Sequence, residues 1–156
     1  MYVIGIDPDV ERNGYAMLDT STRKVNVCTA TLPVLLEMVD VINSTALAAG
    51  VKLKVYVEAG WISTSNWHIG RNDTKLTASK KGIGVGRNHQ RGMDIVELLQ
   101  HRGIDVEAVP PLRKVWKGPD RKITHDELVR IVGEVKHTNQ EGRDAALLAW
   151  VKSGIR

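Results

Sequence analysis

The stretch Val3-Ile4-Gly5-Ile6-Asp7 is a short apolar run that ends in a carboxylate. A second strand is predicted over 52–58, where apolar and polar residues alternate and the run again ends in an acid, Glu58. If these strands lie parallel and adjacent, both carboxylates emerge at the same carboxyl edge of the sheet, the usual place for a site in an α/β fold. Each acid taken alone could instead begin a turn, which Asp-Pro at 7–8 favours.

Strands and helices are predicted to alternate around this pair. Two further strands, over 15–18 and 25–29, surround a polar turn and follow the turn dipeptide Asn13-Gly14. The remaining pattern predicts helices over 31–49, from about 86 to 100, from the capping box at Thr124 onward and over 140–153. It also predicts a strand over 104–109 and a long irregular loop over 59–81. We therefore expect one α/β domain over residues 1–156, with a mixed sheet covered on both faces.

The composition is that of a globular protein, with 42% hydrophobic and 26% charged residues in 156. No apolar run approaches the ~20 residues of a membrane span, and the amino end meets an acid too early for a signal peptide. The single cysteine, Cys28, excludes an internal disulfide and a cysteine zinc site. These features predict a cytoplasmic protein without a membrane partner.

The net charge of +4 is concentrated in two segments. Residues 71–91 hold six basic side chains and one acid, and residues 113–122 hold five and one. Clustered cations release counterions from phosphates, so this pattern favours nucleic acid as a partner, although two solvated surfaces would have the same composition. The candidate DNA-binding cations are Arg71, Lys75, Lys80, Lys81, Arg87, Arg91, Arg113 and Lys114.

A glycine-rich segment, Gly82-x-Gly84-x-Gly86, lies in the first of these basic segments. It follows no predicted strand and lacks the Gly-Lys-Ser/Thr ending, so a nucleotide loop is disfavoured. Flexible glycines before a helix could still offer backbone N–H groups to a DNA phosphate.

Asp144 falls on the predicted inward face of the last helix, with Leu147, Leu148 and Val151 at the helical spacing. Glu141 lies three residues earlier on nearly the same face. An inward carboxylate needs a proton, a cationic side chain or a metal ion, although an acid in a first helical turn also gains from the helix dipole. Together with the two strand-end acids, this pair predicts an all-oxygen Mg²⁺ site in which Mn²⁺ can substitute. Two such ions could hydrolyse a phosphodiester.

Three motifs occur in order along the chain: Ile4-Gly5-Ile6-Asp7-Pro8 with Gly14-Tyr15-Ala16, then Val55-Tyr56-Val57-Glu58, then Arg143-Asp144-Ala145-Ala146-Leu147. Together they resemble the RuvC-type Holliday-junction resolvases of the ribonuclease-H-like superfamily, over nearly the whole chain. The resemblance implies a five-stranded mixed sheet in order 3-2-1-4-5 with helices on both faces. It also implies a homodimer that nicks four-way DNA junctions in recombination and repair with the help of a metal ion.

The resemblance also implies the site residues. The catalytic candidates are Asp7, Glu58, Glu141, Asp144, Lys117 and Lys122. The four acids among them are the metal ligands, with Glu141 where the family commonly has Asp, and either lysine could match the family's basic catalytic position. Trp61, three residues after Glu58, lies near the family's position for an aromatic that stacks at the junction, and Trp67 is a second candidate.

One departure from the family pattern concerns the site directly. The family's Asp-Pro-Gly is Asp7-Pro8-Asp9 here, which adds a negative charge beside the site. Two alternative functions stay open at this point: a non-catalytic junction-binding relative, and a ribonuclease H that acts on RNA–DNA hybrids.

Overall fold

The computed structural model describes residues 1–63, 72–136 and 138–155, and its centre is one five-stranded sheet. The strands are β1 (Tyr2–Asp7), β2 (Asn13–Asp19), β3 (Lys24–Ala30), β4 (Leu53–Glu58) and β5 (Val106–Val109). Their order is β3-β2-β1-β4-β5, with β2 antiparallel to both β1 and β3, and with β4 parallel to both β1 and β5. The predicted fold class and strand order are confirmed.

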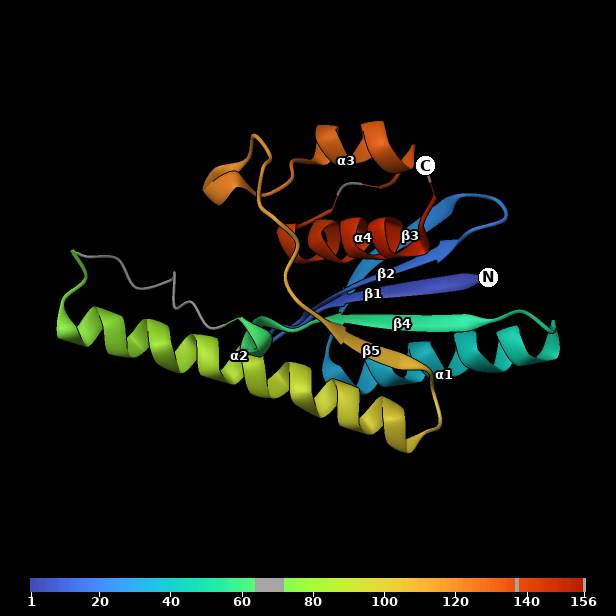
Figure 1. The fold of residues 1–156 in the computed structure, drawn as a ribbon, viewed down its shortest axis with the longest axis horizontal. Helices are drawn as coiled ribbons and strands as arrows, with labels where there is room; N and C mark the ends of the chain where they lie inside the picture. Colours follow the sequence, from blue (N-terminus) through green and yellow to red (C-terminus); the bar gives the residue numbers. More distant parts are fainter. Residues whose placement is uncertain (64–71, 137, 156) are drawn as a thin grey trace.

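Helices cover both faces of the sheet (Figure 1). The helices are α1 (Leu32–Ala48), α2 (Lys75–His101), α3 (His125–Val132) and α4 (Gln140–Ser153). α1 and α2 pack on one face around Ile4 and Ile6, whereas α4, with α3 beyond it, packs on the other face around Val3. The alternation of side chains along β1 therefore supplies both apolar cores. Among the described residues, none of the helices combines the length and the apolar character needed to cross a membrane.

The last two helices lie where the sequence predicts them. α4 occupies residues 140–153, and α3 begins after Thr124, whose side chain accepts from the backbone N–H of Glu127. The Glu127 carboxylate in turn accepts from the backbone N–H of Thr124 at 3.0 Å, which completes the predicted capping box.

The start of α2 was predicted wrongly. The helix begins at Lys75 instead of near residue 86, because Thr74 caps it by accepting from the backbone N–H of Thr77 at 3.2 Å. Residues 82–86 are therefore helix interior. Their backbone N–H groups belong to the helix, so the expectation that they could receive a DNA phosphate was also wrong.

Two glycines allow α4 to lie directly on the sheet. A Cβ at Gly5 would clash with the carbonyl oxygen of Ala145, and one at Gly14 would clash with that of Glu141. Since Gly14 pairs with Asp7 across β1 and β2, the second contact places the first turn of α4 over the end of β1.

We expect Gly5→Ala to lower the free energy of unfolding by roughly 2–3 kcal/mol or more, because the methyl group meets backbone that cannot rotate away. Gly86→Ala is the matched control. A Cβ at this exposed helical position meets nothing within 4 Å, so this variant should be about 0.5–1 kcal/mol more stable than the parent. Urea unfolding of the three proteins measures both effects, and a neutral Gly5→Ala would contradict the close approach of α4.

Candidate active site

The four predicted acidic residues line one cavity of about 630 Å³ at the carboxyl edge of β1 and β4. Asp7 is the last residue of β1 and Glu58 the last of β4, and these parallel strands are in register up to the pair Ile6 and Val57. Glu141 and Asp144 come from the first two turns of α4. Residues far apart in the sequence thus place four carboxyl groups around one space.

The rest of the cavity wall is basic and aromatic. The segment that follows β5 contributes Arg113, Lys114 and Lys122, and α2 contributes His89. Trp61, in the short 3-10 turn Gly60–Ile62 after β4, completes this part of the wall. The cavity therefore combines four acids with several cationic side chains. Such a lining could bind a phosphate-containing ligand together with metal ions.

Two of the carboxyl groups in the cavity, those of Asp7 and Glu58, have raised pKa values. Burial raises the pKa of Asp7 well above its ordinary value, and the negative charges of Glu58 and Asp144 add to this effect. Burial and the charge of Asp144 raise the pKa of Glu58 to about 6, although the nearby Lys114 and Lys122 act in the opposite direction. The cluster therefore favours binding a proton or another cation.

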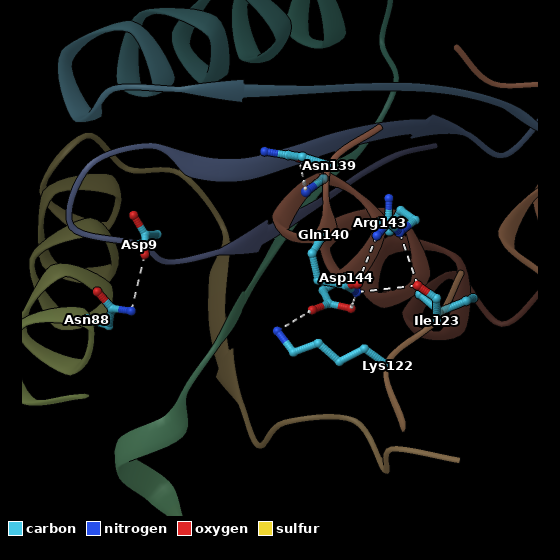
Figure 2. A network of polar contacts seen from close by, with 9 residues as sticks. Asp9, Asn88, Lys122, Ile123, Asn139, Gln140, Arg143 and Asp144 are labelled. Carbon is cyan, nitrogen blue, oxygen red and sulfur yellow. Dashed lines mark hydrogen bonds and ion pairs between the residues drawn. The ribbon is translucent and has the colours of Figure 1, made fainter. Parts of the chain in front are cut away.

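Lys122 is a cation within this cluster (Figure 2). Its Nζ lies 3.2 Å from Oδ2 of Asp144. Burial alone would lower the pKa of Lys122, but the charges of Asp144 and Asp7 outweigh it and raise the pKa. Lys117, in contrast, has an exposed side chain outside the cavity lining, and its backbone N–H donates to the Glu127 carboxylate at 3.2 Å. Of the two candidate lysines, the structure places Lys122 in the cavity.

The chemistry of the donors fits Mg²⁺, since carboxylates in a negatively charged pocket are the ligands that this ion prefers. As the side chains lie, however, no group of three or more Asp, Glu, His or Cys in residues 1–63, 72–136 and 138–155 is arranged to hold a metal ion. Mg²⁺ commonly keeps several waters and uses only one or two carboxylates together with substrate phosphates, so this arrangement is compatible with Mg²⁺ binding. Binding to Asp144 through Oδ2 would require Lys122 to move.

Asp9, which departs from the family pattern, holds the turn between β1 and β2. Its Oδ1 accepts from the backbone N–H of Glu11 at 2.9 Å, and its Oδ2 accepts from Nδ2 of Asn88 at 3.3 Å (Figure 2). Asn88 also accepts from the backbone N–H of Val10 at 3.0 Å. The extra carboxylate thus fastens the chain after Asp7 to α2.

Of the two tryptophans predicted to contact DNA, the structure describes Trp61. Trp61 is half-buried against α2, where a Cβ at Gly92 would clash with its ring, and it meets His89 edge-on with 6.4 Å between ring centroids. It also lines the cavity, so part of its surface faces the proposed ligand space. Trp67 lies outside the described residues, as does Arg71.

The predicted DNA-binding cations that the structure describes fall into three sets, which are exposed on α2, bonded to neighbouring groups, or placed at the cavity. Lys75, Lys80 and Arg87 are exposed on the first half of α2. Lys81 pairs with Asp73 at 2.8 Å, and Arg91 donates to the backbone carbonyl of Val10 at 3.1 Å. Arg113 and Lys114 lie at the cavity instead.

Three participants were missed by the sequence reasoning. His89 reaches the cavity from a segment whose helical start was misplaced. Gln140 and Arg143 contact one another beside the acids of α4, and Gln140 donates to Asp144. The i, i+4 spacing of Gln140 and Asp144 is a signal that could have identified this pair.

No model of a known protein family matches the chain, and no curated protein sequence matches it. Among solved structures, the chain is similar to RuvC of Thermus thermophilus in complex with a Holliday junction substrate, with a TM-score of 0.49 and 18% sequence identity over 98% of this chain and 93% of that chain. A second T. thermophilus RuvC structure has a TM-score of 0.46, with the same identity and coverage. These structures come from the family that the sequence motifs resemble.

We predict that Glu58→Gln stabilises the metal-free protein at neutral pH but not in acid. The pKa of Glu58 is about 6 in the folded state and 4.5 in an ordinary environment, so the folded state holds a proton that the unfolded state loses between these values. Stability therefore falls as the pH rises through this window, by roughly 2 kcal/mol at about 1.4 kcal/mol per pKa unit. The variant lacks this loss.

Urea unfolding in EDTA at pH 4 and pH 8 measures the difference between Glu58→Gln and the parent. The exposed residue Glu97 on α2 supplies a matched control, and Glu97→Gln should stay within about 0.5 kcal/mol of the parent at both pH values. An equal effect of Glu58→Gln at both pH values would argue against a raised pKa.

Proposed function

We propose that this protein is a metal-dependent, structure-selective DNA endonuclease that nicks four-way junctions or related branched DNA in recombination and repair. The observation that carries the proposal is that carboxyl groups from β1, β4 and α4 line one cavity together with Lys122, whose ammonium group lies 3.2 Å from Asp144. Burial first, and neighbouring negative charges second, raise the pKa values of Asp7 and Glu58, so the ionised forms of these acids are disfavoured without a compensating cation. A site for divalent cations explains why they are kept together.

Asp7, Glu58, Glu141 and Asp144 are the residues that would hold Mg²⁺, or Mn²⁺ in its place. Such ions supply activation of a water molecule and stabilisation of the leaving oxygen in phosphodiester hydrolysis. Lys122 is held beside Asp144 in the cavity, where its ammonium group can contact a non-bridging phosphate oxygen. Lys114 and Arg113 line the same cavity and add positive charge for the phosphates on either side.

The exposed half of α2 extends this surface away from the cavity. His89 lines the cavity, and the helix continues from there toward its amino end, past the sheet (Figure 1). Lys75, Lys80 and Arg87 are exposed along this segment, so a DNA strand bound in the cavity could follow them. Trp61 at the cavity wall could stack on an unpaired base, an interaction worth about 1–3 kcal/mol.

A homodimer suits this activity, because resolving a four-way junction requires cuts in two strands and each chain supplies one cavity. Met93 and Leu98 near the carboxyl end of α2 are 40% and 36% exposed, and we propose this part of the helix as the contact between the two copies. A membrane takes no part in the proposal.

One observation favours a second candidate function, a non-catalytic protein that binds junctions. The ion pair between Lys122 and Asp144 neutralises part of the cluster without a metal ion, as a site that no longer cleaves would need. The raised pKa values of Asp7 and Glu58 favour the endonuclease, because Lys122 leaves these two acids incompletely compensated.

We predict that the parent protein cleaves a labelled four-way junction with Mg²⁺ and leaves linear duplex intact. Asp7→Asn removes a proposed metal ligand without changing the size of the side chain. It should lower cleavage by more than the ~10–100-fold typical of residues that only support a ligand. Its affinity for the junction in Ca²⁺ or in metal-free buffer should stay within about threefold of the parent, since phosphate contacts dominate binding.

The same assay includes an RNA–DNA hybrid. Cleavage of the hybrid alone would identify a ribonuclease H, and tight junction binding without cleavage in Mg²⁺ or Mn²⁺ would identify a binding protein. Undiminished Mg²⁺-dependent cleavage by Asp7→Asn would refute the assignment of the active site.

A further inference from the structure

Gln140 and Arg143 lie beside the acids of α4, and neither has a carboxylate with which to bind a metal ion. We propose that they are positioning residues, which together select the oxygen of Asp144 that faces the cavity and fix the backbone next to Lys122. We name this pair the α4 brace. The inference rests on the proposed metal-dependent function and assigns residues of this chain that support it.

Arg143 sets the orientation of the Gln140 amide. Its Nη2 donates to Oε1 of Gln140 at 2.9 Å. A guanidinium group can only donate hydrogen bonds, so the oxygen of the amide must face Arg143 and the NH₂ group must face away from it. Arg143 is itself fixed, because its Nε donates to the carbonyl of Ile123 at 3.0 Å and its Nη1 donates to the carbonyl of Thr138.

The oriented amide then holds Asp144 (Figure 2). Nε2 of Gln140 donates to Oδ1 of Asp144 at 2.8 Å, whereas Oδ2 of Asp144 faces Lys122 at 3.2 Å. The two oxygens of one carboxylate thus have different partners. Oδ1 accepts from an amide of the same helix, and Oδ2 is the oxygen paired with the ammonium group of Lys122.

The same pair holds the segment that carries Lys122. The carbonyl of Ile123, the next residue, accepts from Arg143 and more weakly from Nε2 of Gln140 at 3.4 Å. Ile123 is only 1% exposed, so its carbonyl needs these donors. The α4 brace therefore positions both members of the ion pair between Lys122 and Asp144.

Helix capping does not account for these contacts. Asn139 caps α4, since its side chain accepts from the backbone N–H of Gly142 at 3.0 Å. Gln140 is thus not needed to begin the helix. Its amide is bonded to the groups that prepare the site, as expected of a residue that supports a metal ligand.

The test is Mn²⁺ binding to the DNA-free protein, followed by electron paramagnetic resonance, with the Mg²⁺ concentration for half-maximal junction cleavage as a second readout. Gln140→Met keeps the length of the side chain and removes both hydrogen-bonding groups. We expect Mn²⁺ affinity to fall about 10-fold or more, and the half-maximal Mg²⁺ concentration to rise by a similar factor. Junction affinity in metal-free buffer should stay within about twofold, because phosphate contacts dominate it.

Arg143→Lys keeps the charge but loses the planar fork that orients the amide, so it should weaken Mn²⁺ binding in the same direction. Because the two residues act in series, the double variant should lose less than the sum of the two effects on the free energy of binding. Gln90→Met is the matched control, because Gln90 is exposed on α2, donates to Asp94 at the same i, i+4 spacing and lies outside the cavity lining; this variant should bind Mn²⁺ like the parent.

Parent-like Mn²⁺ affinity in a folded Gln140→Met, or additive effects in the double variant, would overturn the proposal. If urea unfolding shows that Gln140→Met does not fold, Arg143→Lys decides the matter, and unchanged affinity in it counts against the α4 brace. Since Mn²⁺ binding requires neither DNA nor cleavage, an inactive parent whose Mn²⁺ site is weakened by Gln140→Met would refute the endonuclease and support the brace. A parent that binds no Mn²⁺ would refute both.

Discussion

The close approach of α4 to strands β1 and β2 determines where the acids of this helix lie. Gly5 and Gly14 leave no side chain between this helix and strands β1 and β2. As a result the first turn of α4 lies over the end of β1, and its two acids face the two that end β1 and β4. A bulkier residue at Gly14 would push α4 away from the sheet and separate the carboxyl groups.

Bringing these carboxyl groups together has an electrostatic cost, which the molecule offsets only in part. Lys122 compensates Asp144 directly, yet the pKa values of Asp7 and Glu58 remain raised. The folded protein therefore contains a site that favours the binding of additional cations. The same imbalance links stability to function, because a divalent ion that binds the folded state would also stabilise it.

The fold was predictable from the sequence because strand and helix periodicities are strong along most of the chain, and the α4 boundaries matched. That Asp7 and Glu58 would share an edge followed from parallel strands alone. The choice of Lys122 over Lys117 was not predictable, since it depends on how an irregular segment folds back on α4. The start of α2 was missed because the glycines in its first half are typical of a loop. The helix nevertheless begins at the cap that the side chain of Thr74 provides.

Diffraction from crystals of the protein soaked in Mn²⁺, with data collected at the manganese absorption edge, would show whether the clustered carboxyl groups bind a divalent ion. We expect an anomalous peak between the carboxyl groups of Asp7, Glu58 and Asp144, with the ammonium group of Lys122 moved away from Oδ2 of Asp144. A cavity without such a peak, in which Lys122 still pairs with Asp144 at high Mn²⁺ concentration, would contradict this expectation.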